Sequence, residues 1–117
     1  MSIKDYYTLE AHSKAKKLPL TLPDGTDKGD HLMIVGVDSI SGQEAKQEMY
    51  RTLASKEITQ TEARNIWIQG FIESWSFDEE CSFDNKIAFL ANAPSIAESI
   101  DIFAANASNF SKKQKRS

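Results

Sequence analysis

Few residues of this chain combine the type and the spacing that metal binding or nucleophilic catalysis requires. His12 and His31 are its two histidines, and Cys81 is its single cysteine. Neither histidine has a second histidine four residues away or a cysteine at zinc-site spacing, so we expect both on the surface. Acidic residues surround Cys81 and disfavour its thiolate, which argues against a nucleophilic role.

An acidic run at residues 78–80, followed by Asp84, offers the oxygen ligands that calcium prefers. It lacks the one-three-five spacing and the central glycine of a calcium loop, so a solvated acidic loop is the better interpretation. Gly25 and Gly29 are not followed by a helix, as a phosphate-binding loop would require. We therefore expect no metal, no cofactor and no catalysis, and interpret the chain as a binding protein.

Length and composition are typical of one folded domain. The chain has 117 residues, of which 40% are hydrophobic and 26% charged. We expect a globular domain over residues 1–110 and a disordered basic tail over residues 111–117. No apolar run approaches the roughly 20 residues that span a bilayer, and no signal-peptide pattern is present, so we expect a cytosolic protein without a membrane partner.

Charge is unevenly distributed along the chain. Four cations fall within the last seven residues: Lys112, Lys113, Lys115 and Arg116. Because the total charge is −3, these four leave −7 for residues 1–110. An acidic body repels phosphates, so nucleic-acid binding is the least favoured function.

A hairpin is predicted near the N-terminus. Leu18, Leu20 and Leu22 alternate with proline and threonine, which is typical of a half-buried strand, and Pro19 restricts that strand to a sheet edge. A second apolar strand follows over residues 31–37, after a loop with two glycines. Two strands alone are marginally stable, so we expect the hairpin of residues 18–37 to pack on three or four helices.

Two central helices are predicted after the hairpin. The first spans residues 41–56, with Ser41 and Glu44 as a capping box and a buried face formed by Ala45, Met49, Tyr50 and Leu53. The second begins after Thr59 or Thr61 and runs to Trp75. Its apolar stripe comprises Ala63, Ile66, Trp67, Gly70, Phe71 and Trp75, and we expect Trp67, Phe71 and Trp75 at the centre of the core. Gly70 within a helix indicates that a neighbouring element approaches closely there.

Two shorter helices complete the prediction. Ser82 is expected to cap the first of them, and Pro94 to begin the last. The sequence therefore predicts an α+β fold, a mainly helical single domain with a small hairpin. Phe77, Phe89 and Phe110 stand off the main apolar stripes, so we predict that these three aromatics form a partner-binding surface.

Several short motifs of this chain also occur in a characteristic order. They are Pro23-Asp24-Gly25, residues 32–39 (LMIVGVDS), Trp75 with its acidic loop, Asn85 to Leu90, Pro94-Ser95-Ile96, Ile100 and Asn109-Phe110. Over Leu18 to Phe110, this series resembles the tail assembly chaperones of long-tailed bacteriophages. The resemblance implies a non-catalytic protein of the host cytoplasm, absent from the mature virion, that binds the tape measure protein and shields its apolar segments.

The resemblance also implies partners and a second product. A longer form made by a programmed frameshift would recruit the major tail tube protein. Lys112-Lys113 fits such a frameshift, because two lysine codons can form an adenine run on which a ribosome slips. Self-association stays open. The alternative is a structural tail protein, either a terminator or a tube-associated subunit, that is retained in the virion.

Overall fold

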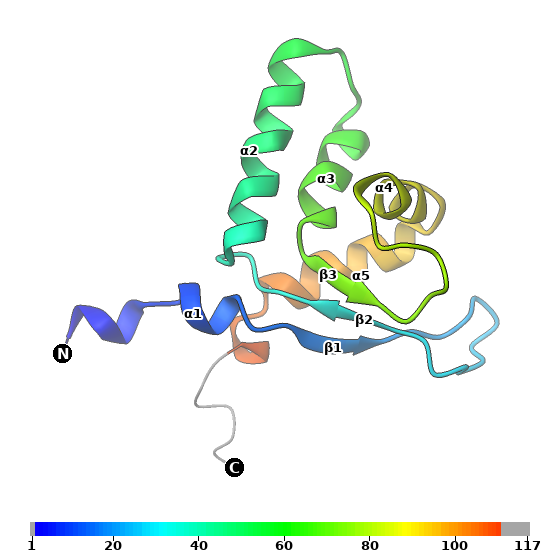
Figure 1. The fold of residues 1–117 in the computed structure, drawn as a ribbon, viewed down its shortest axis with the longest axis horizontal. Helices are drawn as coiled ribbons and strands as arrows, with labels where there is room; N and C mark the ends of the chain where they lie inside the picture. The colour runs from blue at the N-terminus through cyan, green and yellow to red at the C-terminus, as the bar shows by residue number, and fades with distance from the viewer. Residues whose placement is uncertain (1, 111–117) are drawn as a thin grey trace.

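The computed structural model describes residues 2–110, so the basic tail at 111–117 lies outside the described residues. Helices dominate, and the predicted α+β class is confirmed (Figure 1). The elements in chain order are η1 (Ile3–Tyr6), α1 (Leu9–His12), β1 (Lys16–Pro19), β2 (His31–Ile34), α2 (Ile40–Ser55), α3 (Gln60–Gln69), β3 (Ile72–Trp75), α4 (Phe83–Asn92), α5 (Pro94–Ala105) and η2 (Ala107–Asn109).

The strands form one antiparallel sheet in the order β1-β2-β3. The predicted hairpin is confirmed, with Leu18 paired to Leu32 and Pro19 on the edge strand. The predicted strand bounds differ, because the first strand spans Lys16–Pro19 and leaves Leu20 and Leu22 outside it. The second strand ends at Ile34, three residues before the predicted end at Val37. The connecting loop bends at Gly25 and Gly29, whose φ angles of 89° and 83° suit glycine.

The third strand was not predicted. The helix expected to reach Trp75 ends at Gln69, and Trp75 instead lies on β3 opposite Leu32. Pairing with β3 satisfies backbone groups along the side of β2 that faces away from β1. At the two ends of this pairing, the Val35 amide donates to Phe71 O at 2.9 Å, and the Ser76 amide donates to His31 O at 3.1 Å. These long-range bonds favour a strand over a continued helix.

Most helix boundaries follow local capping signals. Thr59 and Glu62 form a reciprocal capping box on α3, Ser82 caps α4, and Pro94 occupies the first turn of α5. The start of α2 differs from the prediction, because Ser39 rather than Ser41 is the N-cap and accepts the Gly42 amide at 3.0 Å. A hydroxyl at either position could cap, and the structure uses the earlier one.

The α2 and α3 helices pack side by side (Figure 1), and α2 closely approaches the end of α3 at Gly70. A Cβ added at Gly70 would overlap Ala45 Cβ and lie 2.8 Å from Ser41 O. The predicted close approach is therefore confirmed. The rest of α2 extends away from the sheet, so Tyr50 is 57% exposed and Leu53 45% exposed, and their predicted burial is wrong.

One hydrophobic core lies between the sheet and helices α3, α4 and α5. Its buried residues are Leu32, Ile34, Ile68, Phe71, Ile72, Leu90, Ala97, Ile100, Ala104 and Phe110. Phe71 is fully buried, as predicted, whereas Trp67 and Trp75 are only partly buried at the edge of this core. The predicted central stripe therefore holds for one of its three aromatics.

His12 is buried, which contradicts its predicted place on the surface, whereas His31 on β2 is half-buried. The His12 Nδ1 atom accepts the Asp38 amide at 3.1 Å, and its carbonyl accepts the Gly36 amide at 2.7 Å. Its ring lies 5.2 Å from the ring of Phe110, centroid to centroid. His12 therefore joins the segment before β1, the segment after β2 and the end of the described chain.

No single helix in residues 2–110 is both long and apolar enough to cross a bilayer. The pair α4 and α5 reaches that length and composition only in combination, and it is bent by 112°.

Candidate functional site

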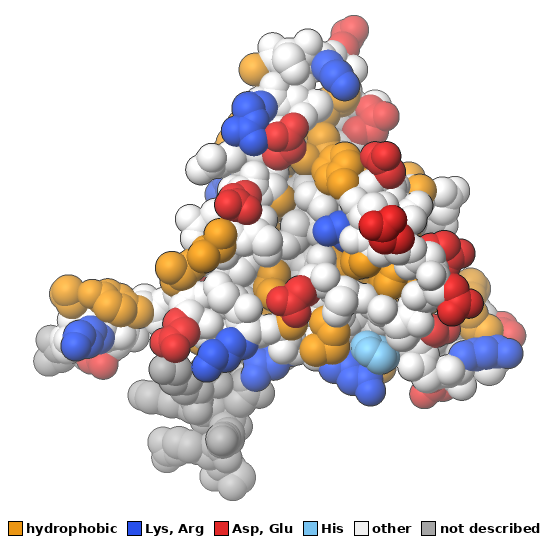
Figure 2. All heavy atoms as spheres, in the orientation of Figure 1, with side chains coloured by type: hydrophobic (Ala, Val, Ile, Leu, Met, Phe, Trp, Pro, Cys, Tyr) orange, Lys and Arg blue, Asp and Glu red, His pale blue; other side chains and the backbone are white. Residues whose placement is uncertain are grey.

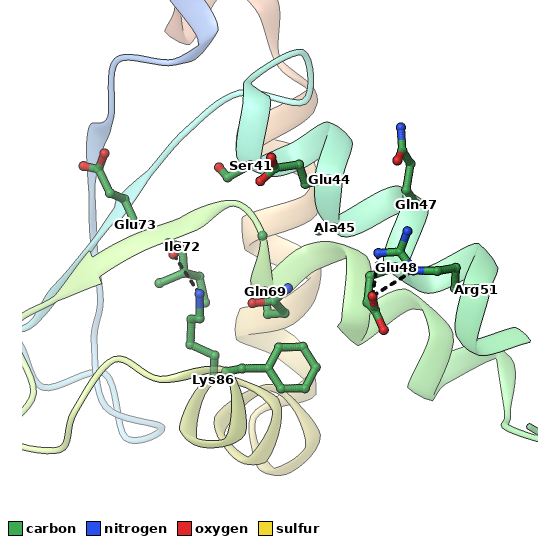
Figure 3. A pocket seen from close by; sticks show the side chains of 12 residues that line it. Ser41, Glu44, Ala45, Gln47, Glu48, Arg51, Gln69, Ile72, Glu73 and Lys86 are labelled. Atoms are coloured by element: carbon green, nitrogen blue, oxygen red, sulfur yellow. Dashed lines mark hydrogen bonds and ion pairs between the residues drawn. The ribbon is translucent and has the colours of Figure 1, made fainter. Parts of the chain in front are cut away.

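A hollow of about 960 Å³ opens between α2, the end of α3, β3 and the start of α4 (Figure 3). We call it the α2–α4 groove. Its lining residues are Ser41, Glu44, Ala45, Gln47, Glu48, Arg51, Gln69, Gly70, Ile72, Glu73, Phe83 and Lys86. Asp and Glu side chains lie over both α2 and α4 on this face of the molecule (Figure 2).

The floor of the α2–α4 groove is formed where α2 meets the end of α3. Gly70 has no side chain, and the Ala45 methyl group packs directly on it. Ile72 begins β3 beside this contact and is buried. Phe83, the first residue of α4, lines the opposite wall and is 47% exposed. The groove therefore combines the exposed ring of Phe83 and a small apolar floor with polar walls, and it is open to solvent.

Carboxylates line the α2 and β3 sides of the groove. Glu48 accepts from Arg51 Nη2 at 2.7 Å on the exposed side of α2, and the Arg51 guanidinium lowers the pKa of Glu48 through this hydrogen bond. Glu44 and Glu73 are exposed and have no ion-pair partner within residues 2–110. Two carboxylates are thus available to cations of a partner.

Lys86 is the half-buried cation of the groove. Its side chain extends from α4 towards β3, and Nζ donates to Ile72 O at 3.3 Å (Figure 3). Burial lowers the pKa of Lys86, and the charge interaction with Cys81 acts against this shift. Burial also raises the pKa of Cys81, so its thiolate is disfavoured as predicted, although burial rather than neighbouring acids is the cause.

The three predicted partner-binding aromatics do not form one exposed surface. Phe77 and Phe89 do come together, with ring centroids 5.3 Å apart, and both pack on Trp75. They are half-buried against the core. Phe110 lies elsewhere, is 2% exposed and packs on His12 and Phe103, so its predicted exposure is wrong.

Sequence reasoning missed the α2–α4 groove, because its walls come from four separate elements. Phe83 gave no local signal, because it lies four residues before Ile87 and seven before Leu90, on the helical face that packs inward. That spacing predicts burial, whereas Phe83 is 47% exposed at the first position of α4.

The α2–α4 groove presents both apolar and charged groups to solvent. It combines apolar contact, two unpaired carboxylates and one half-buried ammonium group. Within residues 2–110, no group of three or more His, Cys, Asp or Glu side chains is placed to hold a metal ion. An open, mixed surface of this kind suits a segment of another polypeptide.

No family model, curated protein or solved structure matches this chain.

Proposed function

We propose that this protein is a tail assembly chaperone of a long-tailed bacteriophage, which binds the tape measure protein and helps to recruit tail tube subunits. Two lines of support converge on this proposal. The ordered motifs between Pro23 and Phe110 resemble that family. The α2–α4 groove carries the structural argument, because it is an open surface on which the exposed ring of Phe83 lies beside two carboxylates without an ion-pair partner in residues 2–110.

A long helical protein that has not yet been enclosed by the tail tube exposes apolar stripes to water, and such stripes aggregate. A groove between helices can hold one of these stripes by burying its apolar side chains. Phe83 offers the largest exposed apolar side chain within the groove. The excess of acidic residues in the body keeps the coated complex dispersed in solution.

The test is co-expression of this chain with the tape measure protein that is encoded in the same tail gene cluster. The proposal predicts that co-expression keeps that tape measure protein in the soluble fraction. The groove variant is Phe83→Ser, which removes an exposed aromatic residue without opening the core. Its matched control is Ile102→Ser on α5, where the side chain is 64% exposed but lies outside the groove. We expect Phe83→Ser to reduce the soluble fraction several-fold and the control to leave it unchanged.

Circular dichroism melting of both variants separates binding from folding, because neither substitution removes a buried group. Equal soluble fractions with wild type and Phe83→Ser would contradict the groove as the binding surface. Precipitation of the tape measure protein alongside the wild-type chain would contradict the chaperone function itself.

The alternative function, a structural tail protein retained in the virion, is tested separately by mass spectrometry of purified virions. A chaperone leaves the particle before completion, so its peptides should be absent while those of the tube protein are abundant. Recovery of this chain in many copies per virion would favour the structural subunit instead.

A further inference from the structure

The α2–α4 groove contains a cation without a counter-ion. Lys86 Nζ is half-buried, yet no carboxylate lies within ion-pair distance of it in residues 2–110. Among the described residues, Lys86 Nζ makes one hydrogen bond, to Ile72 O at 3.3 Å, which is longer than the usual 2.9 to 3.0 Å. An ammonium group has three donors, so two of them remain available.

The carboxylates of the groove are directed elsewhere. Glu73 follows Ile72 on β3, but its side chain points away from Lys86 (Figure 3). Glu48 is paired with Arg51 on the outer side of α2. Desolvating an ammonium group costs free energy unless an anion or several acceptors replace the lost water, and here the chain supplies one carbonyl.

Packing of the lysine stem does not explain this arrangement. A lysine that only covers apolar surface with its methylene groups extends its ammonium group towards water. Lys86 instead directs its ammonium group to the backbone of β3, within the groove that also holds Phe83. Its position is that of an anion-binding group beside an apolar contact.

We propose that Lys86 binds a carboxylate on the tape measure segment that occupies the α2–α4 groove, an inference that rests on the chaperone function proposed above. The segment is an amphipathic helix with an Asp or Glu beside its apolar stripe. Its apolar side chains contact Phe83 and its carboxylate pairs with Lys86. Basic residues flanking the stripe face Glu44 and Glu73.

The test uses 20-residue peptides that tile the tape measure protein, with binding to the full chain measured by fluorescence anisotropy. Lys86→Met keeps most of the aliphatic stem and removes the charge, and Lys86→Arg keeps the charge. We expect Lys86→Met to weaken binding of the tightest peptide about ten-fold, a typical loss for a close ion pair, and Lys86→Arg to weaken it less.

A peptide in which the paired Asp or Glu is replaced by Asn or Gln provides the matched control. It should bind wild type and Lys86→Met equally, because the ion pair is already absent. In wild-type protein labelled at the lysine ε-carbon, NMR titration should show the pKa of Lys86 rising when the acidic peptide binds. A purely structural lysine would not respond to that carboxylate.

The outcomes distinguish the two proposals. If wild type binds peptides but Lys86→Met binds them equally well, the role of Lys86 is overturned and the chaperone function stands. If wild type binds none of the peptides and does not keep the tape measure protein soluble, both proposals fail. Urea unfolding of each variant identifies any loss of binding that comes from loss of folding.

Discussion

Gly70→Ala tests the contact that positions α2 over the floor of the groove. The backbone at Gly70 has φ −67° and ψ −16°, a conformation that alanine adopts without strain. The effect of the substitution is therefore steric. The new methyl group would overlap Ala45 Cβ and lie 2.8 Å from Ser41 O and 3.2 Å from Trp67 O.

The magnitude follows from two opposing contributions. Adding a methyl group to a well-packed contact costs about 1 to 3 kcal/mol. Replacing glycine by alanine at an allowed conformation recovers about 0.4 to 1 kcal/mol through the unfolded chain. Two of the three closest atoms belong to the backbone, which shifts less readily than a side chain. We therefore expect a net loss of about 2 kcal/mol in the free energy of unfolding.

Urea unfolding of the full chain measures this loss as a lower midpoint with an unchanged slope. Ala45→Gly provides the matched test, because it removes the methyl group that the new one would overlap. Alone it should cost about 1 kcal/mol as a glycine within a helix, and in the Gly70→Ala background it should restore part of the stability. Unchanged stability of Gly70→Ala, or strict additivity of the two changes, would refute the packing argument.

Three further predictions concern stability. Phe71→Ala should lower the free energy of unfolding by about 3 to 5 kcal/mol in urea titration, because Phe71 is fully buried, and a loss below about 1 kcal/mol would contradict its central place. His12→Leu should speed hydrogen exchange at the Asp38 amide, which loses its Nδ1 acceptor, and unchanged exchange would show that the bond is not formed. Burial lowers the pKa of Lys86 from 10.5, so the folded state binds fewer protons than the unfolded state and stability rises as pH increases through the folded pKa towards 10.5. Cys81 acts oppositely, since its pKa is raised from 9.0 and stability is lost above pH 9. Lys86→Met should therefore gain stability relative to wild type at pH 7 and lose that advantage by pH 10.5 in urea titrations, and a constant difference across this range would contradict the shift.

Features that depend on neighbouring residues were predictable from the sequence. The capping box of Thr59 and Glu62 and the start of α5 at Pro94 each require only a few consecutive residues. The close approach at Gly70 was predictable because glycine within a helical pattern needs a packing reason. The hairpin followed from alternation and from the glycine-containing loop.

Features that depend on distant partners were not predictable. The burial of His12 could not be predicted, because histidine occurs both on protein surfaces and in interiors. His12 is buried by its contacts with Gly36 and Phe110, which lie far from it in the sequence. The choice of Ser39 over Ser41 as the α2 cap accompanies close packing at Gly42, where an added Cβ would lie 3.0 Å from Phe71 Cε1. The residues at 72–75 are too few for their alternation to outweigh the helical pattern before them.

The unpredicted turn into β3 is also what creates the candidate site. Had α3 continued to Trp75, the Ile72 carbonyl would have bonded within the helix and would not have been available to Lys86. The chain instead leaves α3 at Gly70, pairs with β2 and returns as α4, which places Phe83 across from α2. The proposed binding surface therefore depends on two features together: a glycine that lets α2 approach, and a four-residue strand stabilised by the far side of β2. Substitutions that weaken either feature should affect partner binding even where they touch no residue of the partner.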